Sequence, residues 1–168
     1  MCHCADCQAW ARWLGTDGIL DGNGGTEVVQ AWPAQVRFTR GAEHVALARL
    51  SAKGLHRWYA ACCRSPVANT MGAGLPFTGV IRAALACEDA ELDERYGAAH
   101  RVQGRYAPGG CPPGVMPSAS FGVIAGAVPI LARGWLAGGA RPSPFFDDAG
   151  EPMRPPRVLT DAERSALG

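Results

Sequence analysis

Residues 26–61, TEVVQAWPAQVRFTRGAEHVALARLSAKGLHRWYAA, indicate the architecture of the chain most directly. They contain runs of valine, alanine, leucine and aromatic residues that are separated by short turns. With one run further along the chain, these segments predict five strands, over residues 26–32, 35–39, 44–50, 55–61 and 77–86. The connections at residues 33–34 and 40–43 are too short for helical crossovers, so they favour an antiparallel meander. The first half of the chain is therefore predicted to be a small β-sheet domain.

The composition is that of a folded domain. Of the 168 residues, 48% are hydrophobic and 18% are charged, which excludes a disordered polyelectrolyte, and 22 Gly with 13 Pro disfavour a long helical bundle. A formal net charge of +1 indicates no broad field for nucleic acid or an anionic membrane. The longest uncharged apolar stretch, residues 121–132, is shorter than the ~20 residues of a membrane-spanning helix. No transmembrane segment is predicted.

The second half of the chain has a different character. We expect, in order, a short acidic helix, a strand, a Pro/Gly linker and an apolar helix, over residues 88–96, 100–106, 108–117 and 121–136. The apolar helix contains Pro129, which predicts an interruption or a kink, and its composition predicts burial against the sheet. A last helix begins at Thr160, which forms a capping-box pattern with Glu163. The chain is accordingly divided into a β domain, residues 1–106, and a helical C-terminal extension, residues 107–168.

Three of the seven cysteines lie in the opening heptapeptide MCHCADC. In an extended segment Cys2 and Cys4 project to the same side, and a turn can bring Cys7 beside them. Three converging thiolates suit a tetrahedral, thiophilic ion, with Zn²⁺ ahead of iron and copper. His3 points away and is expected to lie at the surface or to support the site from outside the ligand set.

A helix is predicted directly after this segment. Asp6 is the expected N-cap, and Gly15 the expected end. Trp10, Trp13 and Leu14 fall on one face of the helix, as in an amphipathic helix.

No secretory signal is visible at the start of the sequence, so the expected location is the cytoplasm. Thiols are kept reduced in that compartment, and closely spaced cysteines there are metal ligands or reactive thiols more often than disulfides.

A second motif follows the meander. Residues 57–66 read RWYAACCRSP, and Gly25, Thr26, Gly41 and Ser51 precede them in the meander. With the opening C-H-C-x-x-C, this order resembles the family of glutathione-dependent formaldehyde-activating enzymes and centromere protein V. The resemblance covers about the first half of the chain. It implies a mainly β fold with added helices, built as a zinc-containing antiparallel β-sandwich of the tent-like kind. It also implies a carbon-sulfur lyase whose partners are glutathione or another small thiol and an aldehyde.

The chain departs from the family pattern at its other zinc site. In the family an upstream C-x-C pair and both cysteines of an aromatic-C-x-x-C-G motif hold a structural zinc. This chain has Ala60 at the first of those cysteines and Arg64 at the glycine, so only Cys63 remains. The upstream pair is absent, and the usual beginning of the domain is expected to be missing before Met1.

Two functions are compatible with the C-x-C-x-x-C zinc that the resemblance associates with activity. Three thiolates give Zn²⁺ a net charge of −1, so its bound water is acidified less than on a neutral site, and an open fourth position favours binding a substrate thiol. Alternatively, Cys63 or its neighbour Cys62 closes the site and makes the zinc purely structural. The predicted ligands are therefore Cys2, Cys4, Cys7 and Cys63.

Two further features have weaker support. Four basic residues lie nearest the metal region by motif context, and a solvated surface role is favoured for each: Arg12, Lys53, Arg57 and Arg64. A redox pair formed by Cys62 and Cys63 is disfavoured because adjacent cysteines close a strained ring.

Overall fold

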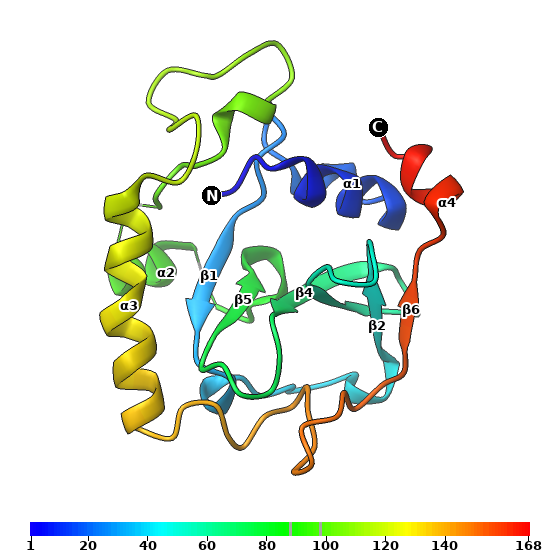
Figure 1. The fold of residues 1–168 in the computed structure, drawn as a ribbon, viewed down its shortest axis with the longest axis vertical. Coiled ribbons are helices and arrows are strands. Elements are labelled where there is room, and N and C mark those ends of the chain that lie inside the picture. Colours follow the sequence, from blue (N-terminus) through cyan, green and yellow to red (C-terminus); the bar gives the residue numbers. More distant parts are fainter. Residues whose placement is uncertain (88, 98) are drawn as a thin grey trace.

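The computed structural model describes residues 1–87, 89–97 and 99–168. Its strands form one six-stranded sheet in the order β1-β5-β4-β3-β2-β6 (Figure 1). The strands are β1 Val28–Ala31, β2 Val45–Arg49, β3 His56–Ala60, β4 Ser65–Thr70, β5 Thr78–Ile81 and β6 Pro156–Val158. Neighbouring strands are antiparallel except β2 and β6, which are parallel. The prediction of a mainly β fold with added helices is confirmed. The strands of the described part of the chain make a single mixed sheet, so a two-sheet sandwich is not confirmed.

Four of the five predicted strands are present, each shorter than expected, as β1, β2, β3 and β5. The strand predicted over residues 35–39 is wrong: the 3-10 helix η2, Pro33–Gln35, occupies its start and the following residues are irregular. Pro33 supplies no backbone N–H, so this segment begins without a donor for a sheet ladder. The strand predicted over residues 100–106 is also wrong. Val102 forms only an isolated bridge, and Gly104–Tyr106 is the 3-10 helix η5.

β4 was not predicted from the sequence, and Pro66 lies near its start. Pro66 is paired with Tyr59, and the register between β3 and β4 shifts between Trp58 and Tyr59. Such an irregularity accommodates a residue that cannot donate to the ladder.

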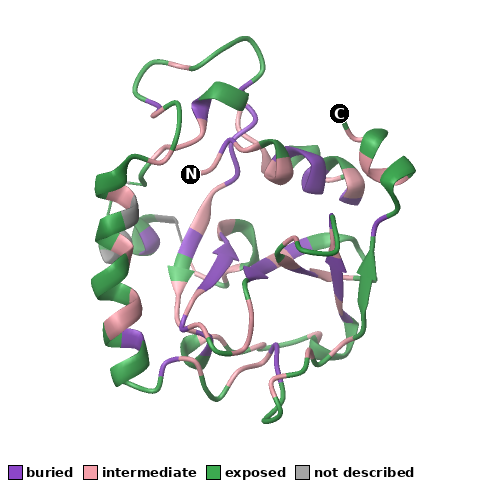
Figure 2. Ribbon diagram, in the orientation of Figure 1, coloured by how far each residue is buried: buried purple, intermediate pink, exposed green. Residues whose placement is uncertain are grey.

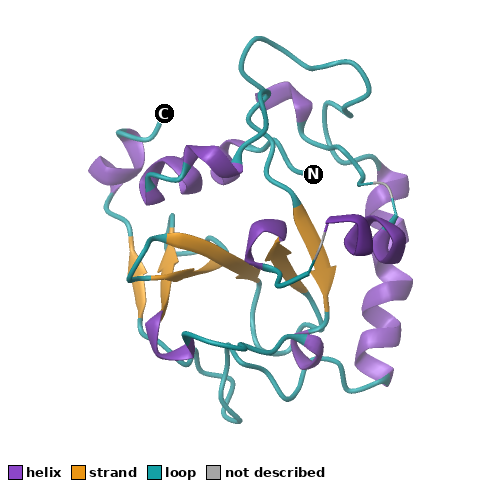
Figure 3. Cartoon of the chain, turned by 180° about the vertical axis from the view of Figure 1, so that it is seen from behind, coloured by secondary structure: helices purple, strands orange, loops and turns teal. Residues whose placement is uncertain are grey.

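The helices surround the sheet (Figure 3). They are α1 Ala5–Leu14, α2 Asp89–Tyr96, α3 Phe121–Leu136 and α4 Asp161–Ser165, with short 3-10 helices η1 Asp17–Ile19, η3 Ala42–His44 and η4 Arg82–Ala84. The predicted bounds of α3 are confirmed, as is the capping box of Thr160 and Glu163 at the start of α4. The predicted start of α2, Glu88, lies outside the described residues.

α1 packs on one face of the sheet. Trp10 and Leu14 from α1 form a buried cluster with Ala48, Leu50 and Leu159. Gly15 ends the helix with φ 67°, in the left-handed region that favours glycine. This packing fixes α1, and with it the cysteine segment at its N-terminus, relative to the sheet.

The opposite face has its own core. Trp58 is fully buried and its ring contacts Phe145 and Phe146 at centroid distances of 5.1 and 5.9 Å. The indole N–H of Trp58 donates to Thr70 Oγ1 at 2.9 Å. Residues from both sides of the boundary predicted at 106/107 therefore pack in one core, and β6 extends the same sheet.

The burial predicted for α3 is wrong, because most of this apolar helix faces outward (Figure 2). Phe121 is 86% exposed and Leu136 is 90% exposed. α3 approaches the rest of the chain closely at Gly134, where a Cβ would lie 2.7 Å from Pro76 and 2.9 Å from Trp32. Within the described chain, no helix has the length and apolar character needed to cross a membrane.

Candidate metal centre

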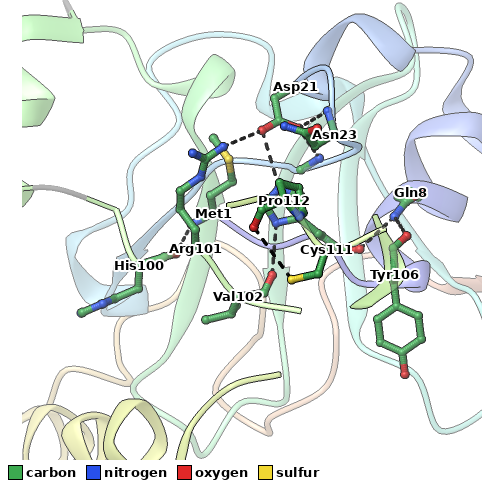
Figure 4. A network of polar contacts seen from close by, with 12 residues as sticks. Met1, Gln8, Asp21, Asn23, His100, Arg101, Val102, Tyr106, Cys111 and Pro112 are labelled. Carbon is green, nitrogen blue, oxygen red and sulfur yellow. Dashed lines mark hydrogen bonds and ion pairs between the residues drawn. The ribbon is translucent and has the colours of Figure 1, made fainter. Parts of the chain in front are cut away.

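The N-terminal segment is held between two other parts of the chain. The N–H of Cys2 donates to the Thr26 carbonyl and the N–H of Thr26 donates back to Cys2, both at 2.9 Å. On the other side the N–H of His3 donates to the Val102 carbonyl at 3.1 Å. Figure 4 shows Met1 and Val102 side by side in this arrangement. The extended conformation predicted around Cys2 is thus enforced by long-range pairing.

The three N-terminal thiols converge. The Sγ atoms of Cys2, Cys4 and Cys7 all lie within 4.8 Å of one another, and those of Cys4 and Cys7 are 3.1 Å apart. All three side chains are partly buried. We call this set the cysteine cluster. It could hold a metal ion, as the spacing predicted.

Cys4, not Asp6, is the N-cap of α1. Its Sγ accepts from the Cys7 backbone N–H at 3.4 Å, and its carbonyl accepts from Gln8 at 3.2 Å. Asp6 instead lies in the first turn and pairs with Arg164 of α4. The helix therefore starts early enough for its positive N-terminal end to face the cysteine cluster, where it favours a thiolate.

Protons are shared unequally within the cysteine cluster. Hydrogen bonds from Cys4 and Cys7 lower the pKa of Cys2 to about 3. The hydrogen bond with Cys2 raises the pKa of Cys4, and hydrogen bonds with both other thiols raise that of Cys7 well above its ordinary value. Without metal the cluster thus favours one thiolate flanked by two donor thiols. A thiophilic cation would displace the remaining protons.

The separations between the sulfur atoms of the cysteine cluster suit a zinc ion. A Zn–S bond of about 2.3 Å in a tetrahedral site places ligand sulfurs about 3.8 Å apart. That value lies between the 3.1 Å that separates the Sγ atoms of Cys4 and Cys7 and the 4.8 Å limit of the whole cluster. Among the described residues no carboxylate joins the three thiols, and such a donor set favours a soft ion over magnesium or calcium.

His3 is buried and supports this segment. The alternative prediction that it lies at the surface is therefore wrong. Its side chain is 0% exposed, its Nδ1 lies 3.2 Å from the Val102 carbonyl, and its Nε2 lies 3.6 Å from Asp21 Oδ2. A Cβ at Gly25 would lie 2.6 Å from His3 Nε2, so only glycine fits there. The imidazole thereby fixes the backbone between Cys2 and Cys4.

Asp21 holds the turn that covers His3, and the sequence analysis did not identify it. Its Oδ1 accepts from the N–H groups of Asn23 and Gly25 at 2.9 and 2.7 Å, and its Oδ2 lies 3.3 Å from Arg101 (Figure 4). Desolvation raises the pKa of Asp21, but those hydrogen bonds and the nearby His3 and Arg101 outweigh it and lower the pKa overall. The turn sequence DGNGG was the available signal, because Asp accepts from the amides that follow it in such turns.

We expect Asp21→Asn to lower the free energy of unfolding by about 1–2 kcal/mol at pH 7, since it weakens hydrogen bonds to a charged acceptor. The folded-state pKa of Asp21 lies below its unfolded value, so this stabilisation is complete above pH ~4 and is lost as pH falls through the folded pKa. Urea unfolding of both proteins from pH 7 to pH 2.5 measures the difference. A difference that grows toward low pH would contradict the assignment.

Gln8 is a second support that sequence reasoning missed. Its side-chain amide is buried and donates to the carbonyls of His3 and Tyr106, both at 2.8 Å (Figure 4). A Cβ at Gly24 would lie 3.0 Å from this side chain. Gln8 therefore connects the first turns of α1 to the segment around η5.

Cys63 is not brought to the cysteine cluster. It lies in the exposed turn between β3 and β4, with its Sγ 3.8 Å from Cys62 and 3.1 Å from Ser65 Oγ. The same turn is bound to the other end of α1, because Arg64 Nε donates to the Leu14 carbonyl at 3.0 Å. Since α1 has 10 residues and rises about 1.5 Å per residue, its length separates this turn from the cluster.

The four basic residues predicted near the metal have other contacts. Arg12 bonds to the Leu167 carbonyl and to Gln8, and Arg57 is buried 3.3 Å from Asn69 Oδ1. The Arg64 guanidinium lies 5.0 Å from the centre of the Trp13 ring. Lys53 is exposed in the turn after β2. None of the contacts described for these side chains reaches the cysteine cluster.

Comparison with known sequences assigns the chain to a family. The sequence model of a family of unknown function, DUF6151, matches residues 1–155. The chain belongs to this family. No curated protein and no solved structure matches it. The DUF6151 match includes the cysteine cluster, all five strands from β1 to β5, and the Phe145–Phe146 segment that packs on Trp58.

Proposed function

We propose that this DUF6151 protein is a zinc-dependent carbon-sulfur lyase that acts on adducts of a small thiol, such as glutathione, with an aldehyde. The convergence of three thiols is the observation that carries the proposal. Among the described residues the cluster holds no fourth cysteine, histidine or carboxylate ligand. A fourth coordination position is therefore available to a substrate.

The residues of the chain have distinct tasks in this proposal. Cys2, Cys4 and Cys7 would hold Zn²⁺, which when bound supplies a Lewis acid that stabilises a substrate thiolate. His3 and Gln8 hold the backbone of the ligand loop, so that the thiols stay converged. The α1 N-terminus adds a fixed positive potential next to an anionic sulfur. The reaction forms or breaks one carbon-sulfur bond: a thiol adds to an aldehyde carbon, and its proton passes to the carbonyl oxygen.

The position of Cys63 favours an open site over a closed one. A closed four-thiolate site would require the β3–β4 turn to leave the C-terminal end of α1, where Arg64 bonds to Leu14 and packs on Trp13.

The proposal also places the protein in the cytoplasm, where its seven free cysteines remain reduced.

Cobalt substitution tests whether a thiol reaches the metal. We expect glutathione to change the visible absorption of the Co²⁺-loaded protein saturably, because a sulfur ligand enters the fourth position. S-methylglutathione, which lacks the thiol, should leave the spectrum unchanged. Cys63→Ser should bind Co²⁺ and respond like the wild type. Loss of the metal in Cys63→Ser, with no response to glutathione in the wild type, would contradict the open site.

Activity is a separate test. Exchange between free formaldehyde and its glutathione adduct, followed by NMR, should be faster with the wild type than with Cys7→Ser. If the zinc-loaded wild type gives no acceleration with glutathione or other small thiols, the lyase proposal is wrong and the cluster is a zinc-binding module only.

A further inference from the structure

A groove lies on the sheet face opposite α1. Val29 pairs with Val80, and Val80 also pairs with Ala68. Ala68 pairs in turn with Trp58, and directly paired residues share a face, so all four point away from α1. Phe145 and Phe146 cover this face at Trp58. Over β1 and β5 the described residues leave this face hollow, with Phe38 among the residues that line the cavity.

Two adjoining cavities make up the groove. The larger, of about 330 Å³, is lined by β1, β4, β5 and the irregular segment after η2, and apart from Gln35 and Arg37 its lining is apolar. The smaller, of about 190 Å³, shares Arg37, Phe38, Val67 and Ala84 with it and is also lined by Cys62. A mostly apolar concavity of this size with a few polar groups is typical of a small-molecule site.

The polar rim of the groove is cationic. Arg37 and Arg40 line it together with His44, and none of the lining residues is acidic. Within the described chain neither Arg37 nor Arg40 has a hydrogen bond or ion pair, whereas Arg82 and Arg101 are both paired with carboxylates. The nearby carboxylate of Glu43 lies 3.5 Å from His44 and lines a different cavity. The groove is thus lined by two arginines, and among the described residues their guanidinium donors have no partner.

We propose that this groove binds a small monocarboxylate with an apolar body. The carboxylate meets Arg37 and Arg40, whose forked donors match its two oxygens, and the apolar body lies on Val29, Val67 and Val80. A single negative charge fits better than a phosphate dianion, because burying a second charge beside an apolar floor costs more desolvation. The site uses no residue of the cysteine cluster and does not depend on the proposed lyase function.

Calorimetric titration with decanoate and with decan-1-ol tests the ligand class. We expect decanoate to bind and decan-1-ol, which has the same chain without the charge, to bind at least ~10-fold more weakly. Absence of decanoate binding, or equal binding of the alcohol, would overturn the proposal.

Paired variants test the location. Arg37→Gln/Arg40→Gln should weaken decanoate binding ~10-fold or more, whereas Lys53→Gln/Arg133→Gln removes the same charge elsewhere and should not. Ala84→Trp should fill the groove and abolish binding. Ala83→Trp, next to it in η4 but lining a different cavity, should retain binding. Thermal unfolding of each variant verifies folding. Wild-type affinity in the arginine variant or in Ala84→Trp would overturn the proposal.

Discussion

Cys4→Ser will purify without stoichiometric zinc, whereas the wild type will carry about one zinc per chain. Cys4 supplies one of three converging sulfurs and also caps α1, so its loss removes a ligand and loosens the loop that presents the other two. Loss of residues that merely support a ligand costs 10–100-fold in metal affinity, and loss of a ligand should cost more than about 100-fold. Competition with a chromophoric zinc chelator measures the change.

The matched control is Cys111→Ser. Cys111 is exposed, its Sγ lies 3.2 Å from the Val115 carbonyl, and it does not belong to the cysteine cluster. It should retain wild-type zinc content. Equal zinc content in the two variants would mean that the metal binds elsewhere or not at all.

Trp58→Ala will lower the free energy of unfolding by about 3–5 kcal/mol. The indole is fully buried between β2, β4 and the Phe145–Phe146 segment, and the variant loses both the packing and the hydrogen bond to Thr70. A domain of this size has a total stability of about 5–15 kcal/mol, so the variant should be close to unfolding at 37 °C. Urea denaturation followed by circular dichroism gives the value.

Trp135→Ala provides the comparison for Trp58. Trp135 is 55% exposed on α3, with one hydrogen bond from its indole N–H to the Gly74 carbonyl. We expect a loss of about 1 kcal/mol, set mainly by that bond. If Trp135→Ala were as destabilising as Trp58→Ala, the larger loss expected from the burial of Trp58 in the core would be contradicted.

Local patterns in the sequence were good guides to local structure. The C-x-C-x-x-C spacing predicted the converging thiols, and the capping pattern at Thr160 predicted α4. Both patterns consist of residues a few positions apart, for which local chain geometry is a strong guide, although pairing with Thr26 and Val102 also holds the cysteine segment extended. The full extent of α3 was also predicted, from its apolar composition.

Sequence reasoning failed on some local features, such as Asp6 as the N-cap of α1 and the strand over residues 35–39, and on long-range relations. β6 joins the sheet by pairing with β2, which is more than 100 residues earlier, and nothing in its three residues indicates that partner. The burial of His3 depends on Asp21 and Val102, and α3 meets the distant residues Trp32 and Pro76 at Gly134. Composition predicted that α3 would be buried, but its side-chain pattern could not show which surface, if any, it would meet.

X-ray absorption of the zinc protein, purified without added thiols, distinguishes an open three-cysteine site from a closed four-cysteine site. We expect three sulfur ligands at about 2.3 Å and one lighter ligand, with a fourth sulfur appearing only after glutathione is added. Cys63→Ser should give the same result. Four sulfur ligands before any thiol is added, in a protein that loses zinc when Cys63 is replaced, would contradict the open site.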